Sequence, residues 1–374
     1  MLFARRQVLL AIPALLASTV AVAQQSRTVK IGAALSMTGP AAAYGATQKN
    51  GVTLAVEEIN ASKFIPGVTL EVVVEDDGSV KEQGINVFQR FINQYKVSAI
   101  IGPTLSTTAT AADPIAQMAK VPVVAVSNTA PTGITDIGDH VWRVSLTEAQ
   151  VIPGAIKKAQ QKLGFKTAGV LYGNDDVFTK AGYDVMKSSL DKLGIKILGT
   201  QTFAKPDRDF NAQLTALKAQ NPEILVVSAL IENASAIVTQ ARQLGYSGPI
   251  LGGNGFNNPA LMKNAGPAAE GVIVGTAWNS ASTDAANVKF KQAMAAKGYA
   301  ADQFAAQAYA GVYVVAEAIR LEGGKAGRGD VNAGLRKVKN FDTPLGKFSF
   351  LPNRDGDHEP AVQIVKDGKF QIMM

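Results

Sequence analysis

The chain has 374 residues, of which 37 are Lys or Arg and 30 are Asp or Glu, so its formal net charge is +7. It contains no cysteine, which excludes disulfides, thiolate chemistry and cysteine-based metal sites. The basic residues are spread along the polar faces of expected helices and do not gather with aromatic residues, so nucleic-acid binding is not favoured.

The first 23 residues have the three parts of a signal peptide. Arg5 and Arg6 form a positive start, 8–20 is apolar, and 21–23 reads Ala-Val-Ala, a small-residue cleavage site. An uncleaved signal anchor is the alternative, but the apolar run is short for a membrane span. Cleavage near Ala23 would leave a mature chain with a net charge of +5. Without a cysteine to carry a lipid, we expect the mature protein to be soluble in the periplasm.

Strand and helix patterns then alternate along about 350 residues, a length that predicts two domains. In the first series, strands are expected at 29–35, 68–75, 99–101 and 121–126, and helices at 44–60, from about 80 to 95, and from Ser106. Asp76-Asp77-Gly78-Ser79 is expected to cap the second of these helices. In the second series, strands are expected at 167–172, 195–203, 224–228, 249–252 and 271–275, and helices at 176–193, 210–219 and 234–244. Further helices are expected at 286–296, 304–321 and 331–338, with late strands near 346–350 and 361–366.

This alternation predicts an α/β fold with two doubly wound parallel-sheet lobes. The last hundred residues are too few for a third lobe, so the chain is expected to return to the first lobe. We predict lobe 1 at 24–146 plus 278–355 and lobe 2 at 147–277 plus 356–374, joined by crossover strands. A cleft between two such lobes is a preferred ligand site.

Polar, uncharged residues follow two successive strands of the first lobe. Ser106-Thr107-Thr108 begin a helix after 99–101, and Ser127-Asn128-Thr129 follow 121–126. Ligands bind at the carboxyl ends of strands in open parallel sheets, and helix N-termini favour anions. The pattern therefore indicates a site for a small carboxylate, although plain helix caps and turns would use the same residues.

A series of short motifs resembles one protein family over nearly the whole mature chain. They are Ile31-Gly32-Ala33-Ala34-Leu35-Ser36-Met37-Thr38-Gly39-Pro40, Tyr44-Gly45, 51–60, Asp76-Asp77, Ile101-Gly102-Pro103, 122–129, Asp207-Arg208-Asp209-Phe210, 240–245 and Glu270-Gly271. In this order they resemble the type I periplasmic solute-binding proteins of ABC importers, in the branch that binds branched-chain amino acids (leucine, isoleucine, valine). The resemblance implies the periplasmic-binding-protein-like I fold, no catalysis and no cofactor or metal. It implies a monomer that delivers its ligand to a membrane permease.

The resemblance also implies which residues bind the ligand. Hydroxyls at Ser106 and Thr129 would bind the ligand carboxylate, and the backbone at Ser127 would receive an ammonium. Aromatic walls fall on Tyr44, Phe178 and Tyr309, although each could be ordinary core packing. Family members that bind α-amino acids place a carboxylate near Asn254 and an aromatic hydroxyl near Leu230.

The residues at these last two positions suggest a different ligand. An ammonium buried without an anionic partner is costly, so the amide and the aliphatic side chain favour a carboxylate without an α-ammonium, such as an aromatic acid or a 2-oxo acid. Asn254 could instead be a turn residue. Glu232 is near enough in sequence to supply the missing charge, so an amino-acid ligand stays the alternative.

Two other classes of function share this pattern. A doubly wound fold could serve an enzyme, but the chain has no G-x-G-x-x-G, P-loop or G-x-S-x-G motif, and neither histidine lies near a serine in a recognisable elbow. A periplasmic domain that presents a ligand to a membrane receptor would use the same cleft. Turnover of a bound ligand would favour the enzyme, and stimulation of a permease ATPase would favour transport over sensing.

Overall fold

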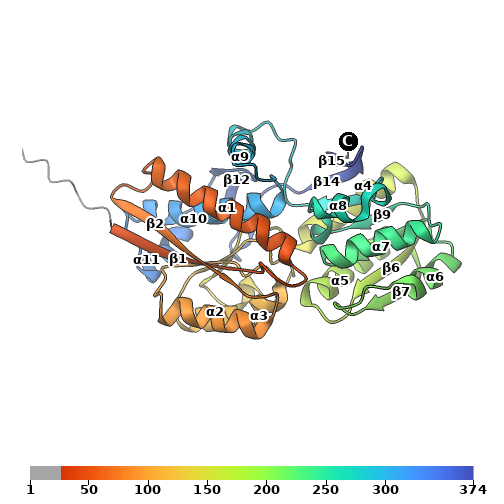
Figure 1. Ribbon diagram of the computed structural model, residues 1–374, viewed down its shortest axis with the longest axis horizontal. Coiled ribbons are helices and arrows are strands. Elements are labelled where there is room, and N and C mark those ends of the chain that lie inside the picture. Colours follow the sequence, from red (N-terminus) through yellow and green to blue (C-terminus); the bar gives the residue numbers. More distant parts are fainter. Residues whose placement is uncertain (1–26, 374) are drawn as a thin grey trace, which may run out of the picture.

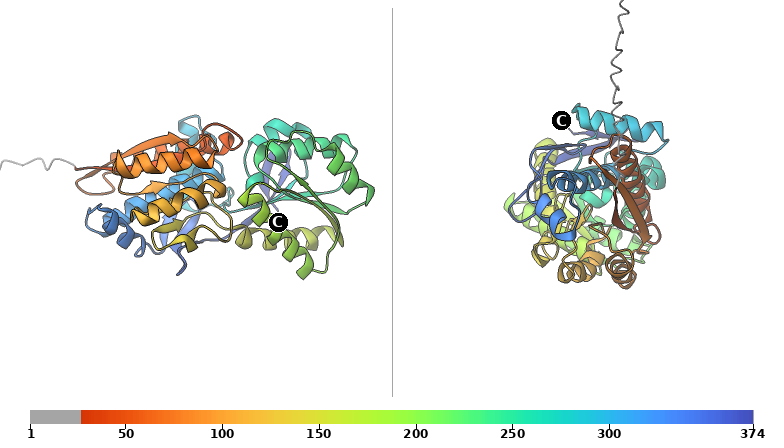
Figure 2. Two further views of the ribbon diagram at one scale, coloured as in Figure 1. Left: turned by 90° about the horizontal axis from the view of Figure 1, so that it is seen from below. Right: turned by 90° about the vertical axis from the view of Figure 1, so that its left-hand side faces the viewer.

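The computed structural model describes residues 27–373, which form two α/β lobes side by side (Figures 1 and 2). The predicted signal peptide, 1–23, lies outside the described residues. No helix within 27–373 is both long enough and apolar enough to cross a membrane.

The first lobe is built on a five-stranded parallel sheet in the order β2-β1-β3-β4-β5. Its strands are β1 (Arg27–Leu35), β2 (Val68–Asp76), β3 (Ile100–Ile101), β4 (Val123–Ala125) and β5 (Val141–Arg143). Alternate side chains of β1 enter different cores: Ile31 and Ala33 pack on the side of α1 (Ala42–Ala61) and α10 (Gln303–Leu321), whereas Ala34 packs with α2 (Lys81–Asn93) and α3 (Ser106–Met118). Both faces of the sheet are therefore covered by helices (Figure 1).

The second lobe is built on a seven-stranded sheet in the order β15-β14-β10-β9-β8-β6-β7. Its parallel strands are β6 (Thr167–Gly173), β7 (Lys196–Phe203), β8 (Ile224–Ser228), β9 (Ile250–Gly252) and β10 (Ile273–Thr276), and β14 (Ala361–Lys366) and β15 (Lys369–Ile372) add an antiparallel edge. Its helices are α4 (Glu148–Leu163), α5 (Val177–Lys192), α6 (Asn211–Ala219), α7 (Ile231–Gln243) and α8 (Ala260–Ala265). Short 3-10 helices of this lobe lie at η2 (Asn254–Phe256) and η3 (Gly266–Ala269), whereas η1 (Thr135–Ile137) lies in the first lobe between β4 and β5.

Within residues 27–373 the chain crosses between the lobes three times: after β5, after β10 and before β14. After the second crossing it forms α9 (Ala285–Ala296), α10, α11 (Arg328–Leu335) and a three-stranded antiparallel sheet of β11 (Phe341–Thr343), β12 (Gly346–Phe350) and β13 (Gly356–Asp357). Phe348 of β12 is buried in the first-lobe core. Because β13 still pairs with β12, residues 356 and 357 belong with the first lobe, just beyond the boundary predicted at 355.

The expected α/β fold with two lobes and crossover strands is confirmed, but several local predictions differ from the structure. The sequence patterns predicted no element at β5, β11, β13, β15 or α4, and α4 carries a proline at position 153 in its interior. Asp76 and Asp77 do not cap α2, whose N-cap is Val80. They accept hydrogen bonds from the loop after β1 instead: Asp76 from the Met37 N–H (2.8 Å) and Asp77 from the Ser36 hydroxyl (2.6 Å).

Candidate ligand-binding site

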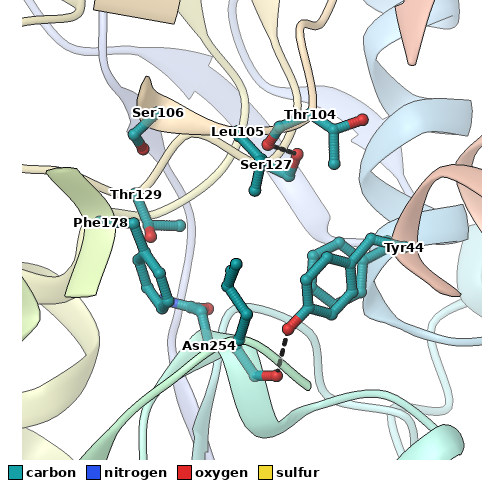
Figure 3. Close-up of a pocket in the computed structure, with 11 residues that line it drawn as sticks. Tyr44, Thr104, Leu105, Ser106, Ser127, Thr129, Phe178 and Asn254 are labelled. Atoms are coloured by element: carbon teal, nitrogen blue, oxygen red, sulfur yellow. Dashed lines mark hydrogen bonds between the residues drawn. The ribbon is translucent and has the colours of Figure 1, made fainter. Parts of the chain in front are cut away.

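A pocket with about 300 Å³ of empty space, part of it open to solvent, lies between the two lobes; it is called the cavity below. It is lined by Tyr44, Thr104, Leu105, Ser106, Ser127, Thr129, Phe178, Leu230, Asn254, Gly255 and Phe304. Seven of the eight predicted site residues are in this lining, and Figure 3 shows Ser106, Thr129 and Phe178 across the cavity from Tyr44. The eighth, Tyr309, is not in it.

Ser106 is the first residue of α3 and follows the end of β3. Gly102 turns the chain there with a φ of +100°, and a Cβ at this position would lie 2.2 Å from the Ala34 carbonyl oxygen, so only glycine fits. Helix α3 has no side-chain cap; the Ser106 Oγ accepts the Ala130 N–H at 3.4 Å instead. The unpaired N–H groups of the first turn and the Ser106 hydroxyl therefore offer donors to an anion in the cavity.

Gln48 forms hydrogen bonds with both Ser127 and Thr104. The Ser127 Oγ donates to the Thr104 carbonyl oxygen (2.7 Å) and accepts from the Gln48 Nε2 (2.7 Å), and the Thr104 Oγ1 donates to the Gln48 Oε1 (2.6 Å). The Ser127 hydroxyl is thus engaged by the protein itself. A ligand contact at this position is left to the backbone, the group that the family resemblance indicated.

The aromatic side of the cavity also joins the lobes. The Tyr44 ring, on α1, stacks on Phe304 with ring centres 4.2 Å apart. Its hydroxyl donates to the Gly255 carbonyl (2.6 Å) and accepts the Ile231 N–H (2.7 Å), both in the second lobe. Burial is the main cause that raises the pKa of Tyr44 well above its ordinary value, so the phenol stays protonated and can donate.

Tyr309 was predicted in the cavity but lies in the first-lobe core, where its hydroxyl donates to the Glu58 Oε2 at 2.7 Å. Phe304, five residues earlier in α10, lines the cavity instead. Five residues correspond to a rotation of about 140° around a helix, so the two rings cannot face the same way. Phe304 could have been found from Asp302, whose side chain caps α10 and marks the helix end that points at the site.

Glu232 does not supply a charge to the cavity. Its carboxylate forms an ion pair with Arg208 at 2.9 Å, and both side chains are about half exposed. An acidic residue that contacts lining side chains is Glu148, at the start of α4, which the sequence patterns did not single out. The signal for it was Thr147-x-x-Gln150, a capping box that starts a helix at this lobe crossing.

Glu148 is fully buried directly behind two lining residues. Its Oε1 accepts hydrogen bonds from the Thr129 Oγ1 and from the Asn254 Nδ2, each at 3.2 Å. Burial raises the pKa of Glu148 to about 7, and these two hydrogen bonds oppose the rise. While Glu148 is ionised, Thr129 donates to it and presents only oxygen lone pairs to the cavity.

Asn254 connects the cavity to a lobe crossing. Its Oδ1 accepts from the Gln303 Nε2 (3.1 Å), and the Gln303 Oε1 in turn accepts from the Thr276 hydroxyl (2.8 Å) and the Ala277 N–H (2.8 Å). Asn254 is therefore a buried link between ligand site and crossover strand. It is not merely a turn residue.

A model of the periplasmic binding protein family matches residues 28–369. The chain belongs to this family. Within it, the predicted resemblance to the branch of leucine-, isoleucine- and valine-binding proteins is confirmed by its relatives.

Three relatives illustrate what this periplasmic binding protein resembles. A leucine-, isoleucine-, valine-, threonine- and alanine-binding protein of Pseudomonas aeruginosa is 28% identical, with 86% of each chain covered. A branched-chain amino acid transporter substrate-binding protein of Streptococcus pneumoniae, solved with isoleucine, is 29% identical with a TM-score of 0.87 over 92% of this chain and 98% of that one. A solute-binding protein of Rhodopseudomonas palustris, solved with 3,4-dihydroxybenzoic acid, shares the fold at 24% identity and a TM-score of 0.83, covering 92% of this chain and 96% of that one. The chain is thus a substrate-binding protein of the ABC-transporter type, and the family consists of solute-binding proteins rather than enzymes.

Proposed function

We propose that this protein captures a small carboxylate in the interlobe cavity and delivers it to the membrane permease of an ABC importer from the periplasm. The observation that carries the proposal is the position of Ser106, at the N-terminal end of α3 and inside a cavity shared by both lobes. Neutral donors at a helix N-terminus stabilise an anion without adding a charge of their own.

The opposite part of the cavity fits an apolar body. Phe178, Leu230 and the stacked rings of Tyr44 and Phe304 surround it, and each of these side chains is at most 7% exposed. A ligand with a carboxylate at one end and a branched or aromatic group at the other would match both parts.

We propose further that the ligand lacks an α-ammonium. The lining contains no ionisable side chain other than the neutral phenol of Tyr44, so a buried ammonium would have no direct anionic partner. The fold does not decide this point, because it accommodates isoleucine in one relative and 3,4-dihydroxybenzoic acid in another. The lining residues must decide it.

A neutral amino acid is the second candidate, and Glu148 is the observation in its favour. An ionised Glu148 would place a negative charge one hydroxyl away from the cavity, through Thr129, where an ammonium could be accepted. The relatives at 28% and 29% identity are named for binding branched-chain amino acids, which points the same way.

A calorimetric screen with matched pairs tests both candidates. Leucine is compared with 4-methyl-2-oxopentanoate and phenylalanine with phenylpyruvate, and benzoate and 4-hydroxybenzoate are added. The proposal expects binding of an oxo or aryl acid and weak or no binding of its amino-acid partner. Tight binding of leucine or phenylalanine without their partners would contradict the ligand class, and binding of none of the panel would count against carboxylate capture. Stimulation of the matching permease ATPase by the loaded protein would distinguish import from sensing.

A further inference from the structure

Glu148 is a buried acidic side chain directly behind two residues that line the cavity. It is the first residue of α4, at the crossing between the lobes, and it contacts one residue from each: Thr129 from the first lobe and Asn254 from the second. Both bonds go to the same atom, Oε1. The Oε2 atom is buried, has no hydrogen-bond partner among residues 27–373, and faces the Gly253 Cα, where an added Cβ would lie 2.5 Å away.

No cation in the described part of the chain neutralises Glu148. The elements packed against α4 are α5, β10 and β14. Their charged residues, Lys180, Asp184, Lys187, Asp191, Lys192 and Lys366, form no ion pair with Glu148. Lys205 pairs with Asp176 at the start of α5, at 3.3 Å, and the buried Arg143 pairs with Asp355 at 2.8 Å. Burial is the main cause that raises the pKa of Tyr44, and the charges of Asp176 and Glu148 add to this rise.

The protonation state of Glu148 fixes what Thr129 can offer. An ionised carboxylate only accepts, so the Thr129 hydroxyl must donate to it and shows lone pairs to the ligand. A carboxylic acid protonated on Oε1 can donate to the Thr129 Oγ1, and the Thr129 hydrogen is then released to point into the cavity. The first arrangement suits an ammonium, and the second suits a carboxylate beside Ser106.

We propose that Glu148 selects the charge class of the ligand by switching Thr129 between acceptor and donor, so that a carboxylate without an ammonium binds together with one proton taken up by Glu148. This inference rests on the proposed function, since it concerns the same cavity. The proton comes from solvent and forms the O–H bond on Oε1, and no other bond is made or broken. Thr129 is the relay, and Glu148 is a positioning residue that does not contact the ligand.

The switch is feasible because Glu148 can be either ionised or protonated near neutral pH. Burial without a cation raises its pKa to about 7, so adding a second negative charge in the cavity is enough to favour the protonated form. If Glu148 stayed ionised, its charge would repel the ligand carboxylate across Thr129, in a region of low dielectric.

Titration calorimetry in two buffers with different ionisation enthalpies measures the proton directly. Wild type, Glu148→Gln, Thr129→Val and the control Glu359→Gln, an exposed residue, are titrated from pH 6 to pH 8.5 with 4-methyl-2-oxopentanoate, benzoate and leucine. For the carboxylate that binds, we expect uptake approaching one proton above pH 7 and an affinity that falls about tenfold per pH unit there. Glu148→Gln and Thr129→Val should lose the pH dependence, whereas the control keeps it.

The outcomes separate this inference from the proposed function. A carboxylate that binds wild type with an affinity independent of pH and with no proton exchanged, or with a proton released, would overturn the role of Glu148 and leave carboxylate capture intact. Proton uptake that persists in Glu148→Gln would overturn it as well. Failure of every ligand in the panel to bind would count against the proposed function itself.

Discussion

We expect the two lobes to open and to close around the cavity, with the present arrangement as the closed form. The Tyr44 hydroxyl tests this directly, because it makes two hydrogen bonds from the first lobe to the second. Tyr44→Phe keeps the ring and its stacking on Phe304 but removes the partner of the Gly255 carbonyl and of the Ile231 N–H. Both groups would be buried and unpaired in the closed form, yet hydrated in an open form.

The free-energy cost of Tyr44→Phe can be estimated from the Gly255 carbonyl and the Ile231 N–H, which lose their partner. A buried polar group left without its partner costs about 1–3 kcal/mol, and the added apolar surface of phenylalanine offsets part of this. We expect a net loss of about 2–3 kcal/mol from closure, which corresponds to roughly a 30-fold to 150-fold shift toward the open form. Ligand affinity should fall by the same factor, since the closed form binds with contacts from both lobes.

The assay uses the absence of cysteine in the chain. Labels on Met118→Cys in α3, a position 77% exposed, and on Lys192→Cys in α5 report the lobe separation by single-molecule energy transfer. Tyr95→Phe, in the first lobe and 37% exposed, is the control. Equal closed populations in Tyr44→Phe and wild type, with and without ligand, would show that the Tyr44 hydroxyl does not stabilise the closed form.

Four other predictions concern single residues. Ser106→Ala should weaken carboxylate binding by about 1–3 kcal/mol, measured by calorimetry, and unchanged affinity would remove the Ser106 hydroxyl from the site. Thr107→Val removes the bond to the Asp176 carboxylate (2.8 Å) and the acceptor of the Val177 N–H (3.0 Å) in the opposite lobe, so the closed fraction should fall in the same energy-transfer assay. Tyr309→Phe should leave affinity unchanged, because its hydroxyl bonds Glu58 in the first-lobe core; a large loss of affinity would speak against that placement. Glu148 has a folded pKa above its ordinary value, so its contribution to stability falls as pH rises from about 4.5 to about 7. In denaturant titrations Glu148→Gln should be nearly as stable as wild type at pH 5 and up to about 3 kcal/mol more stable at pH 8, whereas equal effects at both pH values would contradict a buried, uncompensated carboxyl.

The fold could be predicted because its signals are local. Apolar runs such as Ile31 to Leu35 enter both faces of a covered sheet, and the Ser106 and Thr129 clusters follow strands that prove to be neighbours. The carboxyl ends of parallel strands meet at one edge, so spacing along the chain was enough to bring these residues together.

The rest of the site could not be predicted, because it depends on contacts between residues that are far apart in the sequence and on the rotation of a helix. Glu148 and Asn254 are 106 residues apart, and their hydrogen bond exists only because a lobe crossing brings α4 to the end of β9. Glu232, close to the predicted site in sequence, instead faces Arg208 on the surface. Phe304 and Tyr309 lie on one helix, and which of them faces the cavity depends on how α10 is rotated in the core. Hydrophobicity alone does not specify that rotation.

The most direct test of the account is a crystal structure of the protein with the tightest-binding acid from the calorimetric screen. We expect a carboxylate at the N-terminal end of α3, within hydrogen-bond distance of the Ser106 Oγ, with the apolar body between Phe178 and the Tyr44–Phe304 pair. A ligand bound outside this cavity, or one whose carboxylate is paired with lysine or arginine side chains, would contradict it.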